Sequence, residues 1–125
     1  MPLERRAQMK TKNRIRARRK KDRRNEEQDT RGFVYVFQIG DTNYYIVGER
    51  TKDVHMALKN WSKKYPDILI NQYREVVDKH ECINAIRNKY ANCKIRRTPV
   101  YVFYEKELDC IADYLEKNHA PSRQI

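Results

Sequence analysis

The sequence predicts an α+β domain in which a small mixed β-sheet is covered by helices. A β-hairpin pattern opens the domain, single helices then alternate with single strands, and the expected order is ββαβαβα. The expected domain spans residues 32–120, after a basic arm at residues 1–31 and before a short tail at residues 121–125. A chain of 125 residues fits one such domain.

The hairpin is predicted from composition and turn signals. Residues 33–39 are almost all β-branched or aromatic, which indicates a strand. Gly-Asp-Thr-Asn at residues 40–43 indicates a turn, and residues 44–48 indicate the returning strand.

A first helix and a third strand follow the hairpin. Residues 51–64 predict the helix, with Thr51 or Asp53 at its N-cap and Pro66 beyond its end. Residues 68–77 predict the strand. The helix side chains expected to face the sheet recur at helical spacing: Val54, Ala57, Leu58 and Trp61.

The last half of the domain repeats the pattern of helix and strand. A second helix is expected to begin at Asp78, with Glu81 completing a capping box. A strand at residues 100–104 and a helix at residues 106–118 follow. The side chains expected to face inward from the two helices are Cys82, Ile83, Ile86 and Tyr90, then Leu108, Ile111, Ala112 and Leu115.

The net charge of +11 is concentrated in the arm, because residues 1–31 hold 13 Lys and Arg against five Asp and Glu, and the remaining residues hold 15 against 12. So many adjacent cations repel one another unless a polyanion neutralises them, and binding to phosphates releases counterions. We therefore expect the arm to bind nucleic acid. The expected contacts are Lys10, Lys12, Arg14, Arg16, Arg18, Arg19, Lys20, Lys21, Arg23 and Arg24, and, in a basic loop of the domain, Arg96 and Arg97.

Other targets of the arm are less compatible with the sequence. The arm lacks the Trp, Phe and Leu face of an interfacial helix, and no apolar run reaches membrane-spanning length. Acidic protein surfaces remain an alternative. We expect an intracellular protein without a small-molecule substrate, and residues 16–24 also fit a nuclear-localisation signal. The choice between DNA and RNA stays open.

The three cysteines indicate reduced thiols and not a metal site. Cys82, Cys93 and Cys110 are odd in number and lack the short ligand spacing of a structural zinc site, and His80 adds no second pair. The sequence thus predicts no metal and no cofactor.

Short motifs of the domain resemble the GIY-YIG endonuclease superfamily, in its divergent branch from phages and large DNA viruses. They are GFVYVF at residues 32–37, YIVG at residues 45–48 and TKDV at residues 51–54, followed by a helix that contains Leu58. The resemblance covers residues 32–118. It implies a nuclease-type fold, and it points to a component of a virus particle or another large nucleoprotein assembly.

The resemblance also locates the family's catalytic positions. Tyr35 matches the first tyrosine and Gly48 the motif glycine, whereas Ile46 stands at the second tyrosine position. The arginine position falls on Ala57, and the glutamate position falls on Ile83 or Asn84. An active enzyme would need substitutes, and the candidates for a magnesium- or manganese-dependent site are Tyr35, Tyr45, Arg50 and Glu81.

The sequence therefore favours a non-catalytic protein that binds nucleic acid with its arm and docks in an assembly with its degenerate domain. One alternative is a structural capsid or scaffold component that binds acidic protein surfaces. The other is a metal-dependent endonuclease with a rearranged site.

Overall fold

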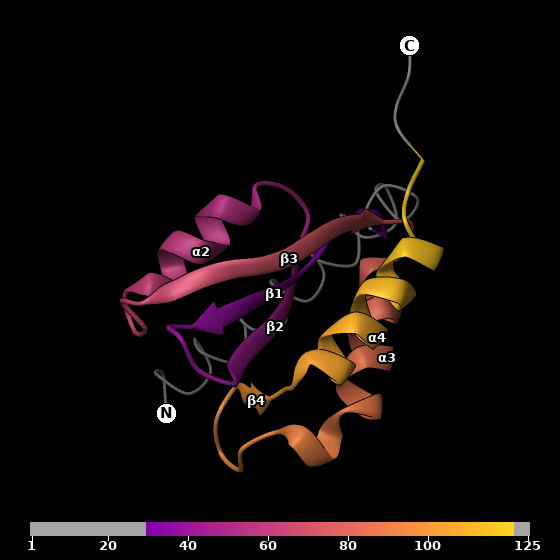
Figure 1. Ribbon diagram of the computed structural model, residues 1–125. Coiled ribbons are helices and arrows are strands. Elements are labelled where there is room, and N and C mark those ends of the chain that lie inside the picture. The colour runs from indigo at the N-terminus through magenta and orange to yellow at the C-terminus, as the bar shows by residue number, and fades with distance from the viewer. Residues whose placement is uncertain (1–29, 122–125) are drawn as a thin grey trace, which may run out of the picture.

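The protein's structure, a computed structural model, describes residues 30–121. It confirms the α+β class and the ββαβαβα order, and adds a short 3-10 helix (Figure 1). No helix among the described residues is long and apolar enough to cross a membrane. The elements are β1 (Gly32–Ile39), β2 (Tyr44–Arg50), α2 (Val54–Ser62), β3 (Ile68–Val76), α3 (Lys79–Lys89), η1 (Ala91–Cys93), β4 (Val100–Val102) and α4 (Glu105–Lys117).

The four strands lie in the order β3-β1-β2-β4, and every pair of neighbours is antiparallel. The expectation of a mixed sheet is thus corrected. The β1–β2 hairpin occupies the centre of the sheet. Strand β3 pairs with the free edge of β1, and β4 pairs with the free edge of β2, in both cases antiparallel. Strands of the same direction are consequently never adjacent.

Helices cover both faces of the sheet, with α2 on one face and α3 and α4 on the other (Figure 1). Side chains of β1 alternate between the two layers, as the period of a strand requires. Val34 and Val36 belong to the cluster with α3 and α4, whereas Tyr35 and Phe37 belong to the cluster with α2. This double burial explains why the first strand is apolar without interruption.

The inner helix faces mostly follow the sequence, whereas of the expected caps Asp53 precedes α2 without a side-chain capping hydrogen bond. The Asp78 side chain accepts a hydrogen bond from the Glu81 backbone N–H at 3.0 Å and so begins α3. All four inward side chains expected from that helix are buried. Ala112 corrects the prediction for α4, because it is exposed. Ile111 and Leu115, one turn apart, already occupy the inner face.

Isolated β-bridges partly cover the two edge strands of the sheet, β3 and β4. On β3, Val76 pairs with His119, and the Ala120 N–H donates to the Glu75 carbonyl at 2.8 Å. On β4, Tyr101 pairs with Lys94. Such bridges occupy backbone groups that an edge strand would otherwise expose.

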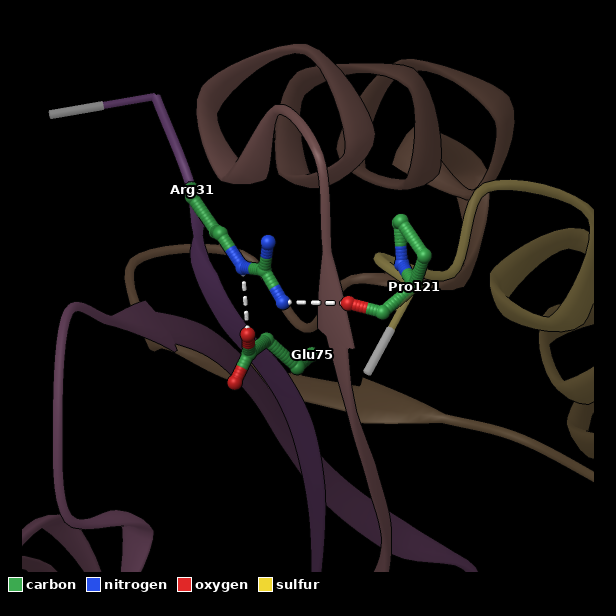
Figure 2. A network of polar contacts seen from close by, with 3 residues as sticks. All are labelled: Arg31, Glu75 and Pro121. Atoms are coloured by element: carbon green, nitrogen blue, oxygen red, sulfur yellow. Dashed lines mark hydrogen bonds and ion pairs between the residues drawn. The ribbon is translucent and has the colours of Figure 1, made fainter. Parts of the chain in front are cut away.

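Arg31 fastens the two ends of the described chain to each other. Its Nε donates to the Glu75 carboxylate and its Nη2 donates to the Pro121 carbonyl at 2.6 Å (Figure 2). The Thr30 carbonyl accepts from the Lys79 N–H at 2.7 Å. The two ends of the described chain, Thr30 and Pro121, thus lie at the same end of the sheet.

Candidate nucleic-acid interface

A segment without any acidic residue runs from Cys82 to Tyr104 and forms the end of α3, η1 and β4. It carries five exposed cations, and we call these side chains the basic surface. They are Arg87, Lys89, Lys94, Arg96 and Arg97.

Tyr101 lies near cations from two parts of the basic surface. Arg87 on α3 lies close enough to Tyr101 to lower the pKa of the phenol by its charge, although burial is the larger effect and raises that pKa overall. Lys94 forms a β-bridge with the same tyrosine. One cation of the helix end and one of the following loop are therefore near the same residue of β4.

Residues 94–98 of this surface form a tight turn that holds two arginines at its tip. The Ile95 N–H donates to the Val100 carbonyl at 2.8 Å, and the Thr98 N–H donates to the Ile95 carbonyl at 3.1 Å. Arg96 and Arg97 are the two central residues of this turn and are exposed. We call residues 94–98 the basic turn.

Arg97 adopts a backbone conformation that disfavours its own side chain. Its φ is 66°, in the left-handed region where glycine is the favoured residue. A residue with a Cβ in this conformation costs about 1–2 kcal/mol. An arginine kept there at a turn tip is the kind of strained residue that is common at binding sites.

The charges of the basic surface are not neutralised within the folded body. None of its five cations forms an ion pair with a carboxylate of residues 30–121. By contrast, Arg31 pairs with Glu75, and Arg74 pairs with Glu116. The unpaired cations are available to phosphates.

Arg96 and Arg97 thus belong to one surface, as the sequence indicated. The ten arm cations lie outside the described residues. Two exposed residues that the sequence did not single out lie near the other end of β4: Tyr44, the first residue of β2, and Tyr104, two residues beyond β4. The sequence pattern predicts them only as strand residues, because alternation alone does not show that a sheet edge stays uncovered.

The four residues proposed for an active nuclease lie on different sides of the sheet. Tyr35 packs in the cluster with α2, and Tyr45 packs in the cluster with α3 and α4. Burial raises the pKa of Tyr45, which opposes its use as a phenolate. Arg50 is half-buried at the end of β2, and Glu81 is exposed on the first turn of α3.

Of the positions at which the resemblance would place an arginine and a glutamate, Ala57 and Ile83 are part of the core, whereas Asn84, the alternative to Ile83, is exposed. Ala57 and Ile83 are only 4% and 2% exposed. Among the described residues, no three His, Cys, Asp or Glu side chains are close enough to hold a metal ion. Cys82, Cys93 and Cys110 are all free thiols.

The packing of Tyr35 explains why the residue opposite it on β2 is a glycine. Its ring stacks on Phe37 with centroids 4.2 Å apart, and its hydroxyl accepts a hydrogen bond from Trp61 Nε1 at 3.2 Å. Tyr35 pairs with Gly48 across the hairpin. A Cβ on Gly48 would lie 2.3 Å from the Tyr35 hydroxyl oxygen, so the ring occupies the space that any side chain would need.

No protein-family model, no curated protein and no solved structure matches this chain. Its function is therefore inferred from its own residues.

Proposed function

We propose that the protein binds nucleic acid through phosphate contacts and serves as a module of a larger assembly. The observation that carries the proposal is the basic surface, five exposed cations without a carboxylate partner among residues 30–121. It adds to the arm, in which ten of the fifteen residues from Lys10 to Arg24 are cationic. The two together offer a polyanion two separate sites of contact.

Contacts of this kind fix the position of nucleic acid without reading its sequence. Lys and Arg neutralise phosphates that are common to every sequence, and affinity falls steeply as salt rises. The expected protein is thus a non-specific binder of DNA or RNA and has no catalytic role.

The opposite edge of the sheet supports the assembly part of the proposal. Leu69 and Tyr73 on β3 are 58% and 43% exposed, and Val77 just beyond the strand is 56% exposed. Tyr73 contacts Phe33 and His55 on the α2 face, whereas Leu69, between Ile68 and Ile70 of that layer, projects from the opposite face. Exposed apolar side chains thus flank this edge strand on both faces, and such exposed apolar surface is typical of sites that dock on another protein. This edge lies across the sheet from β4, so docking and nucleic-acid binding would not compete.

A salt series of binding to labelled duplex DNA tests the proposal with the full chain and three charge-neutralised variants. The arm variant replaces the ten cations from Lys10 to Arg24 by Gln, and the turn variant is Arg96→Gln with Arg97→Gln. The control, Lys106→Gln with Lys117→Gln, removes the same charge as the turn variant from α4, a helix rich in acidic residues.

We expect the arm variant to lose most of the affinity. The turn variant should lower the slope of log K against log salt by about 1.8, because each lost phosphate contact contributes about 0.9 on duplex DNA. The control should leave the slope unchanged. Equal slopes for the turn variant and the control would contradict a role of the basic turn. Absence of binding by the full chain near physiological salt would instead favour a structural component that binds acidic protein surfaces.

A further inference from the structure

We infer that the β4 edge is a binding site for single-stranded nucleic acid, on which bases stack against Tyr44 and Tyr104. This inference rests on the proposed function and specifies its ligand. We call these two residues the edge tyrosines. They are 46% and 59% exposed, among the largest exposed apolar side chains of the described residues.

The edge tyrosines are neighbours on one face of the sheet. Tyr44 pairs with Val102, and the Phe103 N–H donates to the Asn43 carbonyl at 3.0 Å, which extends the pairing by one residue. Tyr104 has an extended backbone, with φ −113° and ψ 176°. It lies two residues after Val102, and side chains two apart in an extended chain point to the same face.

Burial of the intervening residues confirms this alternation. Tyr45, Tyr101 and Phe103 are buried in the cluster with α3 and α4. Their neighbours Tyr44 and Tyr104 therefore project from the opposite face. Diagonal cross-strand neighbours are about 7–8 Å apart, which corresponds to about two steps of a stacked strand at 3.4 Å each.

The basic turn and this aromatic pair lie near opposite ends of the short strand β4. Ile95 in the turn is hydrogen-bonded to Val100, the first residue of β4, and Tyr104 lies just beyond the last. Ile95 is itself 38% exposed and adds an apolar side chain next to Arg96. Cations that track the backbone, combined with aromatic rings for the bases, are the common features of single-strand binding sites.

Nearby acidic residues indicate which part of the ligand lies where. Glu105 directly follows Tyr104, and Asp41 lies in the turn that precedes Tyr44; both are exposed. Their charges repel phosphates but not uncharged bases. Phosphates are thus expected at the basic turn and bases at the edge tyrosines. A duplex hides the faces of its bases, and so of this site it can use only the basic turn.

Binding of the full chain to a labelled single-stranded DNA oligonucleotide and to the duplex of the same sequence tests this inference. The decisive variant is Tyr44→Leu with Tyr104→Leu, which keeps apolar area but removes the aromatic faces. Tyr73→Leu is the matched control, because Tyr73 is similarly exposed (43%) on the far edge strand β3. Tyr44→Phe with Tyr104→Phe tests rescue by a ring without a hydroxyl.

Stacking of each base contributes about 5- to 150-fold in affinity, so we expect the double Leu variant, which loses two rings, to bind the single strand at least about 25-fold more weakly. Its duplex affinity should stay within about twofold, and the Phe variant and the control should resemble the wild type. Urea unfolding checks that the variants are folded. Tyr104→Leu alone, at the more exposed position, should show the same selective loss in smaller degree.

Two results would overturn the inference, and they are distinguishable. If the wild type binds both ligands and the double Leu variant weakens both equally or neither, the edge tyrosines do not stack on bases, although the proposed function stands. If the wild type binds neither ligand, the proposed function fails as well.

Discussion

Replacing Gly48 by Ala should destabilise the domain by about 2 kcal/mol, because the new methyl group would overlap the Tyr35 ring. The added Cβ would lie 2.3, 2.4 and 2.8 Å from the Oη, Cζ and Cε1 atoms of Tyr35. The ring has little freedom to retreat, since it stacks on Phe37 and accepts a hydrogen bond from Trp61.

The magnitude follows from three contributions. Forcing extra volume into a packed core costs about 1–3 kcal/mol, and losing the Trp61 hydrogen bond costs about 1 kcal/mol. Alanine is better than glycine within a strand by about 0.5–1 kcal/mol, which offsets part of the loss. A net loss of 2 kcal/mol lowers the melting temperature of a domain of this size by roughly 10 °C.

Urea denaturation of a double-mutant cycle measures the effect and its cause. Tyr35→Leu removes the atoms that clash, so the cost of Gly48→Ala should be at least about 1 kcal/mol smaller in the Tyr35→Leu background. Gly40→Ala serves as the control, because its φ of +56° makes the backbone the source of strain while its nearest new contact is an ordinary 3.6 Å. Tyr35→Leu should not alter its cost.

Two outcomes would refute this reasoning about the hairpin. One is a Gly48→Ala variant as stable as the wild type, which would mean that the Tyr35 ring moves freely. The other is strict additivity with Tyr35→Leu, which would mean that the cost arises elsewhere. A nucleic-acid affinity that is unchanged in a folded Tyr35→Leu variant would further support a packing role for Tyr35.

Two other perturbations separate stability from binding. Arg97→Gly removes a Cβ from a left-handed conformation, so the free energy of unfolding, measured by urea denaturation, should rise by about 0.5–1 kcal/mol. The salt slope of duplex binding should fall by about 0.9, because one phosphate contact is lost. A lower stability or an unchanged slope would contradict this prediction. Raising the pH should destabilise the fold. Burial raises the folded-state pKa of four phenols and one thiol above their usual values of about 10 and 9. At alkaline pH the folded state therefore holds more protons than the unfolded state, and its stability falls as the pH rises. Stability should therefore be full below about pH 9 and decline as the pH rises through the folded pKa values. Phenolate absorbance should appear at higher pH in the native protein than in denaturant. Identical titration curves for the native and the denatured protein would contradict this prediction. The groups are Tyr45, Tyr90, Tyr101, Tyr114 and Cys82.

Much of the domain is predictable from local patterns. The hairpin, the three helices and the cap at Asp78 depend on residue spacing and on side chains that act on their own backbone. The basic loop is also local, because Lys94, Arg96 and Arg97 are close in sequence. Periodicity was less successful for Ala112, because a stripe of apolar residues can be wider than the face that a helix buries.

The sequence by itself determined the elements, their order and the uneven distribution of charge, because propensity, periodicity and charge act over a few residues. Only the tertiary structure decided which strands became neighbours and which side chains met. It placed Tyr35 and Tyr45 on opposite faces, and it brought Tyr44 beside Tyr104 although 60 positions separate them in the chain. Strand pairing sets such contacts through long-range packing of the whole core, which no local pattern encodes.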